Sequence, residues 1–172
     1  MWRSDLRSAF LAKLPTGGRI ADIGCGAGAD TSFFAAAGLS VLALDKCERA
    51  IGQIPHQPNV TAVCAELETF DFELCAFSGI WACAVLCFLP RDRFEVSFDR
   101  LWLSLRRPGV LAITMPMVDS ARLVGPKRLL GITECQMREF LERHRPSSVQ
   151  VSVYWSQRHL SRLRWFIAMV EK

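Results

Sequence analysis

The chain has 172 residues, 51% hydrophobic and 22% charged, a composition typical of a globular protein rather than a disordered one. This length predicts a single domain over residues 1–172. No apolar run reaches the roughly 18 residues that a membrane-spanning helix needs, and the charged N-terminus does not resemble a signal peptide, so we expect a cytoplasmic protein without membrane partners. The net charge of +4 is mild, and the basic residues after position 120 are not interleaved with aromatics, which disfavours a nucleic-acid groove.

Apolar periodicity alternates along the chain between helical and strand spacing, a pattern typical of an α/β fold with a parallel sheet. We predict helices at 4–14, 30–37, 47–53, 91–105 and 133–144. We predict strands at 19–23, 40–44, 59–64, 78–86 and 110–114, followed by an antiparallel pair at 147–155 and 162–170. Residues 115–132 contain two prolines and two glycines with little periodicity, which predicts a long loop. The elements together predict a seven-stranded, mostly parallel sheet flanked by helices, with a C-terminal antiparallel hairpin.

Seven cysteines raise the question of disulfides or a metal site. Their number is odd, no CxxC pair occurs, and most lie in apolar runs, where cysteine behaves as a small hydrophobic residue. Cys83 and Cys87 are four residues apart, but at the end of a strand this spacing does not converge on one ion. We therefore expect reduced, buried thiols and no metal.

A glycine-rich turn, Asp22-Ile23-Gly24-Cys25-Gly26-Ala27-Gly28, follows the first predicted strand. Glycine permits backbone angles that other residues avoid, and it lets a ligand approach the main chain. Open parallel sheets bind ligands at the carboxyl ends of their strands. Asp45 ends the second strand, where its carboxylate is placed to accept both hydroxyls of a ribose. The turn and this acid together predict a nucleoside site.

The same turn is compatible with two cofactors, because Gly24, Gly26 and Ala29 also satisfy the dinucleotide pattern that permits alanine at the third position. Asp22 favours S-adenosylmethionine. This acid would be buried and unpaired unless a cationic or hydrogen-bonding partner reached it, and the methionine part of that cofactor carries an amino group. A dinucleotide pyrophosphate would instead be repelled by Asp22. An NAD(P)-dependent oxidoreductase stays as an alternative.

From Gly18 to Pro116 the chain resembles the class I S-adenosylmethionine-dependent methyltransferases, particularly the small single-domain enzymes of the generic and tellurite-resistance kinds. Blocks of residues agree with that family in order and spacing: Ile20 to Gly28, Val41 to Asp45, Ala65-Glu66-Leu67, and Ser78 to Pro90 followed by Leu105-Arg106-Arg107-Pro108-Gly109. The resemblance implies a Rossmann-like fold, S-adenosylmethionine as cofactor and methyl transfer as the activity.

The resemblance also implies a role for each matching residue. Asp22 and the backbone of Gly24, Cys25 and Gly26 would hold the methionine part of the cofactor. Asp45 would bind the ribose, with Lys46 beside the ribose and adenine. Glu66 would accept a hydrogen bond from the adenine amino group, and Leu67 would pack near the ring. Ala82 and Cys83 would line the floor beneath the methyl-bearing sulfur.

Three residues depart from the family pattern. Ser78 stands where aspartate is common, Phe88 where many relatives have histidine, and Val110 in place of a second glycine after Pro108-Gly109. No catalytic base is assigned, so the sequence leaves the acceptor atom open. The absence of an inserted domain favours a small-molecule acceptor, chosen by the N-terminal helix, residues 85–92 and the loop 116–132. A catalytically inactive methyltransferase-like binding or scaffold protein stays as a second alternative.

Overall fold

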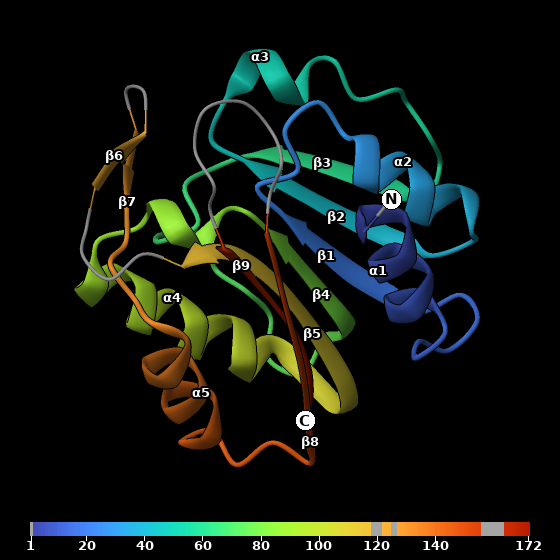
Figure 1. Ribbon diagram of the computed structural model, residues 1–172. Coiled ribbons are helices and arrows are strands. Elements are labelled where there is room, and N and C mark those ends of the chain that lie inside the picture. The colour runs from blue at the N-terminus through green and yellow to red at the C-terminus, as the bar shows by residue number, and fades with distance from the viewer. Residues whose placement is uncertain (1, 118–121, 125–126, 156–163) are drawn as a thin grey trace.

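The computed structural model describes residues 2–117, 122–124, 127–155 and 164–172 (Figure 1). Its helices are α1 (Trp2–Leu11), α2 (Ala29–Ala36), α3 (Glu48–Ile51), α4 (Arg91–Ser104) and α5 (Glu134–Glu142), with a 3₁₀ turn η1 (Leu86–Phe88). Its strands are β1 (Arg19–Ile23), β2 (Ser40–Asp45), β3 (Val60–Cys64), β4 (Phe77–Cys83), β5 (Leu105–Met117), β6 (Arg122–Val124), β7 (Lys127–Leu129), β8 (Ser148–Trp155) and β9 (Arg164–Glu171).

Seven of these strands form one mixed sheet in the order β3-β2-β1-β4-β5-β9-β8. The first five are parallel, and β9 runs antiparallel to both β5 and β8. This arrangement confirms the predicted α/β class, the mostly parallel sheet and the C-terminal antiparallel pair. The chain order reverses at β1, so β1 and β4 lie side by side at the point where open sheets bind ligands.

Each face of the sheet carries its own hydrophobic core, because successive side chains of a strand point to opposite faces. On one face, Leu6 and Phe10 of α1 and Phe34 of α2 pack with Ile20 and Trp81. On the other face, the apolar sides of α4 and α5 cover the sheet, and these two helices lie away from α1 and α2 in Figure 1. The two layers bury most of the residues of the central strands β1, β4 and β5, which explains their nearly continuous apolar sequence.

The predicted strand 78–86 is too long at its carboxyl end. β4 stops at Cys83, and Ala84 takes a left-handed backbone conformation with φ +56°. The Ala84 amide N–H donates to the Thr114 carbonyl at 2.9 Å, which fixes this bend before η1. The apolar run continues past the bend because η1 is also buried, so hydrophobicity alone does not mark the end of the strand.

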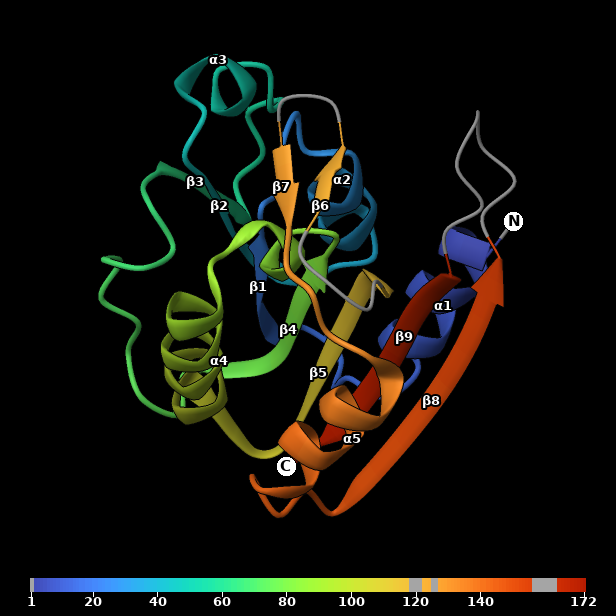
Figure 2. The same ribbon diagram turned by 60° about the vertical axis from the view of Figure 1, so that its left-hand side comes forward.

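The predicted loop at 115–132 contains two further strands and the end of a third. β5 extends to Met117, and β6 and β7 form an antiparallel pair in which Leu123 faces Arg128. Figure 2 shows this pair standing beyond the end of β4. The Leu130 amide N–H donates to the Cys87 carbonyl at 2.7 Å, which anchors the pair to η1. Three-residue strands are too short to produce a recognisable alternation, so the sequence analysis was wrong here.

The prediction of buried thiols is wrong for most of the cysteines. All seven lie in the described part of the chain and none forms a disulfide, but only Cys87 is buried, Cys25 and Cys83 are partly exposed, and the other four are exposed, namely Cys47, Cys64, Cys75 and Cys135. Cys64 ends β3, an edge strand with several exposed positions, and Cys135 lies in the first turn of α5. Cys64 is therefore exposed although apolar residues precede and follow it, and Cys135 lies between two polar residues, Glu134 and Gln136. In the described part of the chain, no helix has both the length and the apolar character needed to cross a bilayer.

Candidate functional site

The glycine-rich turn after β1 has two glycines that the protein's own packing requires and one that faces open space. Gly24, Gly26 and Gly28 all have positive φ, at +67°, +55° and +80°. A Cβ at Gly24 would lie 2.6 Å from Val85 Cγ2, and one at Gly28 would lie 2.8 Å from Ile54 Cγ1. A Cβ at Gly26 would meet no atom within 4 Å. The backbone at Gly26 is therefore open to a ligand.

Asp45, at the end of β2, holds this turn in place. The Gly26 amide N–H donates to Asp45 Oδ2 at 2.9 Å, and the Cys47 amide N–H donates to Oδ1 at 2.9 Å. The Leu44 carbonyl accepts from the amides of Gly24 and Cys25 at 2.7 and 3.1 Å. An ionised carboxylate offers about four lone-pair positions, so each Asp45 oxygen retains capacity for one more donor.

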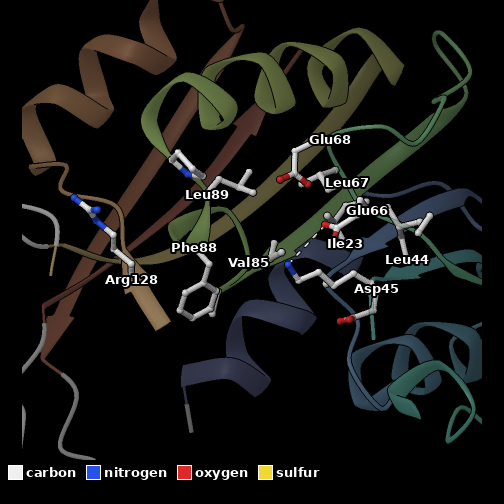
Figure 3. Close-up of a pocket in the computed structure, with 15 residues that line it drawn as sticks. Ile23, Leu44, Asp45, Glu66, Leu67, Glu68, Val85, Phe88, Leu89 and Arg128 are labelled. Carbon is white, nitrogen blue, oxygen red and sulfur yellow. Dashed lines mark ion pairs between the residues drawn. The ribbon is translucent and has the colours of Figure 1, made fainter. Parts of the chain in front are cut away.

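A cavity of about 540 Å³ lies next to the turn, at the carboxyl ends of β1, β2 and β4 (Figure 3). This volume falls within the range of roughly 300–1,000 Å³ that small-molecule and cofactor sites occupy. Its walls come from the strand ends, from the loop after β3, from η1 and from β7. They are formed by Ile23, Gly24, Leu44, Asp45, Lys46, Ala65, Glu66, Leu67, Glu68, Ala84, Val85, Phe88, Leu89, Pro90 and Arg128.

The acidic residues of the cavity lie at one end, together with Lys46, and a second cation lies at the other end. Asp45, Glu66 and Glu68 gather at one end, and Arg128 lies at the opposite end (Figure 3). Lys46 Nζ lies 3.7 Å from Glu66 Oε2, and both side chains are more than half exposed, so solvent screens this ion pair. The negative end of the cavity therefore adjoins the glycine-rich turn.

Arg100 of α4 positions the acidic loop after β3. Its guanidinium donates to the carbonyl oxygens of Leu67 and Glu68, at 3.4 and 2.5 Å, and to that of Phe70. These bonds fix the backbone that presents Glu66 and Leu67 to the cavity. The sequence analysis did not find this residue, because its partners are backbone atoms about thirty positions away along the chain.

Five of the predicted site residues line the cavity together: Gly24, Asp45, Lys46, Glu66 and Leu67. The other five do not line it: Asp22, Cys25, Gly26, Ala82 and Cys83. Ala82 has no exposed surface and packs in the core beneath α4. Cys83 is partly exposed, and its sulfur accepts a hydrogen bond from Thr114 Oγ1 at 3.2 Å. Their roles toward a ligand stay predictions.

Asp22 has a partner within the protein, contrary to the reasoning that a ligand must supply one. Its side chain is 2% exposed, and Thr31 Oγ1 donates to Asp22 Oδ2 at 2.6 Å. Thr31 belongs to α2, and it reaches Asp22 because α2 packs against β1. Sequence reasoning did not predict this contact. The buried carboxylate is thus satisfied without a ligand, so its burial no longer favours one cofactor over another.

The Cys25 thiol is held in its protonated form. Burial raises its pKa from 9.0 to about 12, and the carboxylates of Asp22 and Asp45 add to this effect. A protonated thiol is a poor nucleophile. The arrangement therefore gives Cys25 a backbone role in the turn rather than covalent chemistry.

Behind the turn, Asp30 of α2 joins three elements. Its carboxylate pairs with Arg7 of α1 and accepts a hydrogen bond from Trp81 Nε1 of β4 at 2.8 Å. Asp30 is 3% exposed and Trp81 is 1% exposed, so the bonds lie within the core. This network fixes the start of α2, and hence the end of the glycine-rich turn, against the sheet.

Of the three departures from the family pattern, only Phe88 lies at the cavity. Ser78 is buried and donates to the Arg19 carbonyl at 2.9 Å, away from the cavity. Val110 is 4% exposed and packs in the core under α1. The apolar ring of Phe88 thus changes the lining of the site, whereas the other two residues serve packing.

Sequence reasoning missed Arg128, the cation at the far end of the cavity. It stands on β7, in a stretch predicted to be loop, among many basic residues that resembled a solvated face. Among the residues described by the structure, no three His, Cys, Asp or Glu side chains are grouped as a metal site. No histidine is found among the residues that line the described cavity.

A family model described as "Methyltransferase domain" matches residues 20–109. This match spans the strands β1 to β4, the glycine-rich turn, the acidic loop and α4. No curated protein sequence matches the chain significantly.

Solved structures of low sequence identity share the fold. The Burkholderia thailandensis 1,6-didemethyltoxoflavin-N1-methyltransferase, solved with 1,6-didemethyltoxoflavin and S-adenosylhomocysteine, is 21% identical with a TM-score of 0.76, over 98% of this chain and 76% of that one. An S-adenosylmethionine-dependent methyltransferase from Mesorhizobium loti is 15% identical with a TM-score of 0.75, over 96% of each chain. The Haemonchus contortus phosphoethanolamine N-methyltransferase 2, solved with S-adenosyl-L-methionine, is 17% identical with a TM-score of 0.77, over 98% of this chain and 52% of that one.

Proposed function

The chain belongs to the methyltransferase domain family, and from this premise we propose that it transfers a methyl group from S-adenosylmethionine to a small-molecule acceptor. The observation that carries the proposal is the junction of the glycine-rich turn with the cavity. The exposed backbone at Gly26 and the carboxylate of Asp45 meet at the edge of a space large enough for a nucleoside.

The residues around the cavity fit an adenosyl group joined to an amino acid. Asp45 can accept the two ribose hydroxyls, because the two backbone amides occupy only part of its acceptor capacity. Glu66 is half exposed beside the cavity, where it can accept from the adenine amino group, and Leu67 offers an apolar surface to the ring. The turn from Gly24 to Gly26, with Asp22 behind it, would hold the methionine part.

The adjoining residues would face the reacting centre. Cys83, which ends β4 and is partly exposed, would lie beneath the methyl-bearing sulfur with Ala82 behind it in the core, and Lys46 would stand beside the ribose. S-adenosylmethionine supplies an electrophilic methyl group on a sulfonium ion when it is bound. Direct displacement by an acceptor nucleophile then needs the two reactants held in line.

The protein's own contribution is binding, orientation and exclusion of water. Alignment of two reactants in a site can supply up to about 7–11 kcal/mol of the barrier reduction in model systems. The ionisable residues that line the described cavity are Asp45, Lys46, Glu66, Glu68 and Arg128, and Asp45 is already engaged by two amides. No general base is assigned among them, which is compatible with an acceptor whose nucleophile is unprotonated or readily loses its proton.

Calorimetric titration tests the proposal directly. S-adenosylhomocysteine, NAD⁺, NADH, NADP⁺ and NADPH are titrated into the protein, followed by mass-spectrometric product detection with S-adenosylmethionine and a panel of small thiols, amines, phenols and carboxylates. We expect S-adenosylhomocysteine to bind, the nicotinamide cofactors not to bind, and one acceptor class to gain 14 mass units, the mass of a CH₂ group. Binding without turnover across the panel would favour a scaffold protein, and binding of NAD(P)(H) alone would favour an oxidoreductase.

A further inference from the structure

A second cavity continues the first one away from the glycine-rich turn. Its volume is about 430 Å³, and it shares Phe88, Leu89, Pro90 and Arg128 with the first cavity. Its remaining walls come from Arg91 at the start of α4 and from Leu129, Leu130 and Gly131 after β7. The two cavities therefore adjoin along these four shared residues, and the first is large enough for the cofactor.

The walls of this second cavity are mostly apolar. Phe88 is 38% exposed and lines both cavities, and Figure 3 shows its ring on the side of the first cavity toward Arg128. Leu129 and Leu130 are nearly buried, at 3% and 6%, because β7 and the residue after it pack against η1. Such walls accommodate an apolar or aromatic body rather than a fully hydrated one.

The charge of the second cavity is opposite to that of the cofactor end. Arg91 and Arg128 line it, and no acidic residue does so in the described part of the chain. Arg91 Nε is paired with Glu95 Oε1 at 2.9 Å, so a neighbouring carboxylate offsets its charge. Arg128 has neither a hydrogen bond nor an ion pair with any described residue and stands exposed at the junction of the two cavities. A guanidinium in this position is complementary to a carboxylate or a phosphate.

We propose that the second cavity is the acceptor subsite, and that it takes a small molecule with an apolar, aromatic-sized body and one anionic group, which Arg128 binds. This inference rests on the proposed function. The anionic group would lie at Arg128, whereas the nucleophilic atom would point toward β4 and the cofactor. The other end carries three acids, Asp45, Glu66 and Glu68, against the single cation Lys46, so its net negative charge would favour an acceptor whose anionic group stays at Arg128.

Probe binding to the protein saturated with S-adenosylhomocysteine tests this subsite without knowledge of the acceptor. Benzoate and phenyl phosphate are each titrated by calorimetry against neutral benzamide, which has a similar size. An exposed ion pair contributes about 1 kcal/mol or less, so we expect at least one anion to bind about fivefold more tightly than benzamide. Raising NaCl from about 0.05 M to about 0.5 M should reduce this preference, because salt screens the guanidinium.

Two variants distinguish Arg128 from the general positive charge of the chain. Arg128→Gln should abolish the preference for the anions while leaving the affinity for S-adenosylhomocysteine within about twofold. Arg93→Gln removes the same charge from α4 at a residue that lines neither described cavity, and it should retain the preference. Comparison of the two variants by circular dichroism and thermal unfolding verifies that both remain folded.

Several outcomes would overturn the inference. These are equal binding of anions and benzamide, no anion binding at millimolar concentration, or an unchanged preference in Arg128→Gln. A large loss of S-adenosylhomocysteine affinity in Arg128→Gln would overturn it as well, because Arg128 would then hold the cofactor. Failure of the wild-type protein to bind S-adenosylhomocysteine contradicts the proposed function instead, and repeating the anion titrations without it keeps the two failures distinguishable.

Discussion

The two ends of the site differ in how they are built. At the cofactor end, the glycine-rich turn and Asp45 are tied together by backbone amides and backed by the Asp30 network in the core. At the acceptor end, Arg128 stands on a short hairpin that β7 and Leu130 attach to η1. The cofactor end is therefore formed mainly by the main chain of central strands. The acceptor end depends on the side chain of Arg128, which stands on a peripheral pair of strands.

This difference indicates at which end of the site residues can be substituted without disturbing the other end. The turn depends on positive φ angles and on close approach to Val85 and Ile54, so few substitutions are compatible with it. The β6–β7 pair contributes the exposed side chain of Arg128, which can change while the sheet stays intact. We expect substitutions at the cofactor end to weaken cofactor binding strongly, and those at the acceptor end to alter acceptor preference only.

Substitution at Gly26 should have the largest effect on cofactor binding. Gly26→Val places a branched side chain in the open space beside the turn, and we expect the affinity for S-adenosylhomocysteine to fall about 100-fold or more by calorimetry, equivalent to about 2.8 kcal/mol.

Gly38→Val is the control for backbone strain. Gly38 also has a positive φ, +85°, and a Cβ there would likewise meet no atom within 4 Å, but it follows α2 outside the site. Both variants should lose a similar free energy of unfolding, about 1–2 kcal/mol, in urea titrations. A comparable loss of affinity in the two variants would contradict the role of the open face at Gly26.

The Cys25 thiol should react slowly because the cofactor end keeps it protonated. The pKa of about 12 reduces the thiolate fraction, although the thiolate is itself more nucleophilic at high pKa, and we expect alkylation at pH 8 about 30-fold slower than at exposed Cys135. Peptide-resolved mass spectrometry after timed iodoacetamide treatment measures both rates.

The raised pKa of Cys25 also predicts how its alkylation rate and its contribution to stability change with pH. Because the pKa of Cys25 is raised in the folded protein, its alkylation rate should still increase about tenfold per unit between pH 8 and pH 10. The raised pKa also means that this thiol favours the folded state fully below pH 9, and that the contribution is lost as pH rises from 9 toward 12. Equal alkylation rates at Cys25 and Cys135 at pH 8 would show that the turn does not suppress the thiolate.

Asp45 should contribute about tenfold or more to cofactor affinity. Asp45→Asn keeps one acceptor oxygen for a backbone amide but loses the charge and the second acceptor, and a hydrogen bond to a charged group contributes about 1.5–3 kcal/mol. Asp71→Asn makes the same change in an exposed loop outside the described cavity and should leave the affinity unchanged. The measurement is calorimetry with S-adenosylhomocysteine, and similar affinities in the two variants would exclude a role for Asp45.

Among the substitutions at the cofactor end, the one at Glu66 should have the smallest effect on cofactor affinity. Its side chain is 53% exposed, so we expect Glu66→Gln to weaken S-adenosylhomocysteine binding only about threefold. Glu68→Gln changes a second acid that lines the same cavity and should alter the affinity less. If Glu68→Gln has the larger effect, the adenine-side acceptor is Glu68 rather than Glu66.

The sequence by itself determined the sheet, the helices on its two faces and the glycine-rich turn followed by Asp45. These features are readable because each depends on local chemistry, namely strand periodicity, the backbone freedom of glycine and the position of an acid at a strand end. The family assignment followed from the same stretch, which the family model later matched over residues 20–109.

Only the tertiary structure decided how that framework is completed. Thr31 satisfies Asp22, Arg100 holds the acidic loop, and Arg128 reaches the cavity from β7, and each acts on residues that are distant in sequence or on backbone atoms. The end of β4 and the hairpin β6–β7 were also decided there, because a buried bend and three-residue strands leave no periodic pattern. Contacts between separate elements depend on how those elements pack, and no single stretch of sequence encodes that packing.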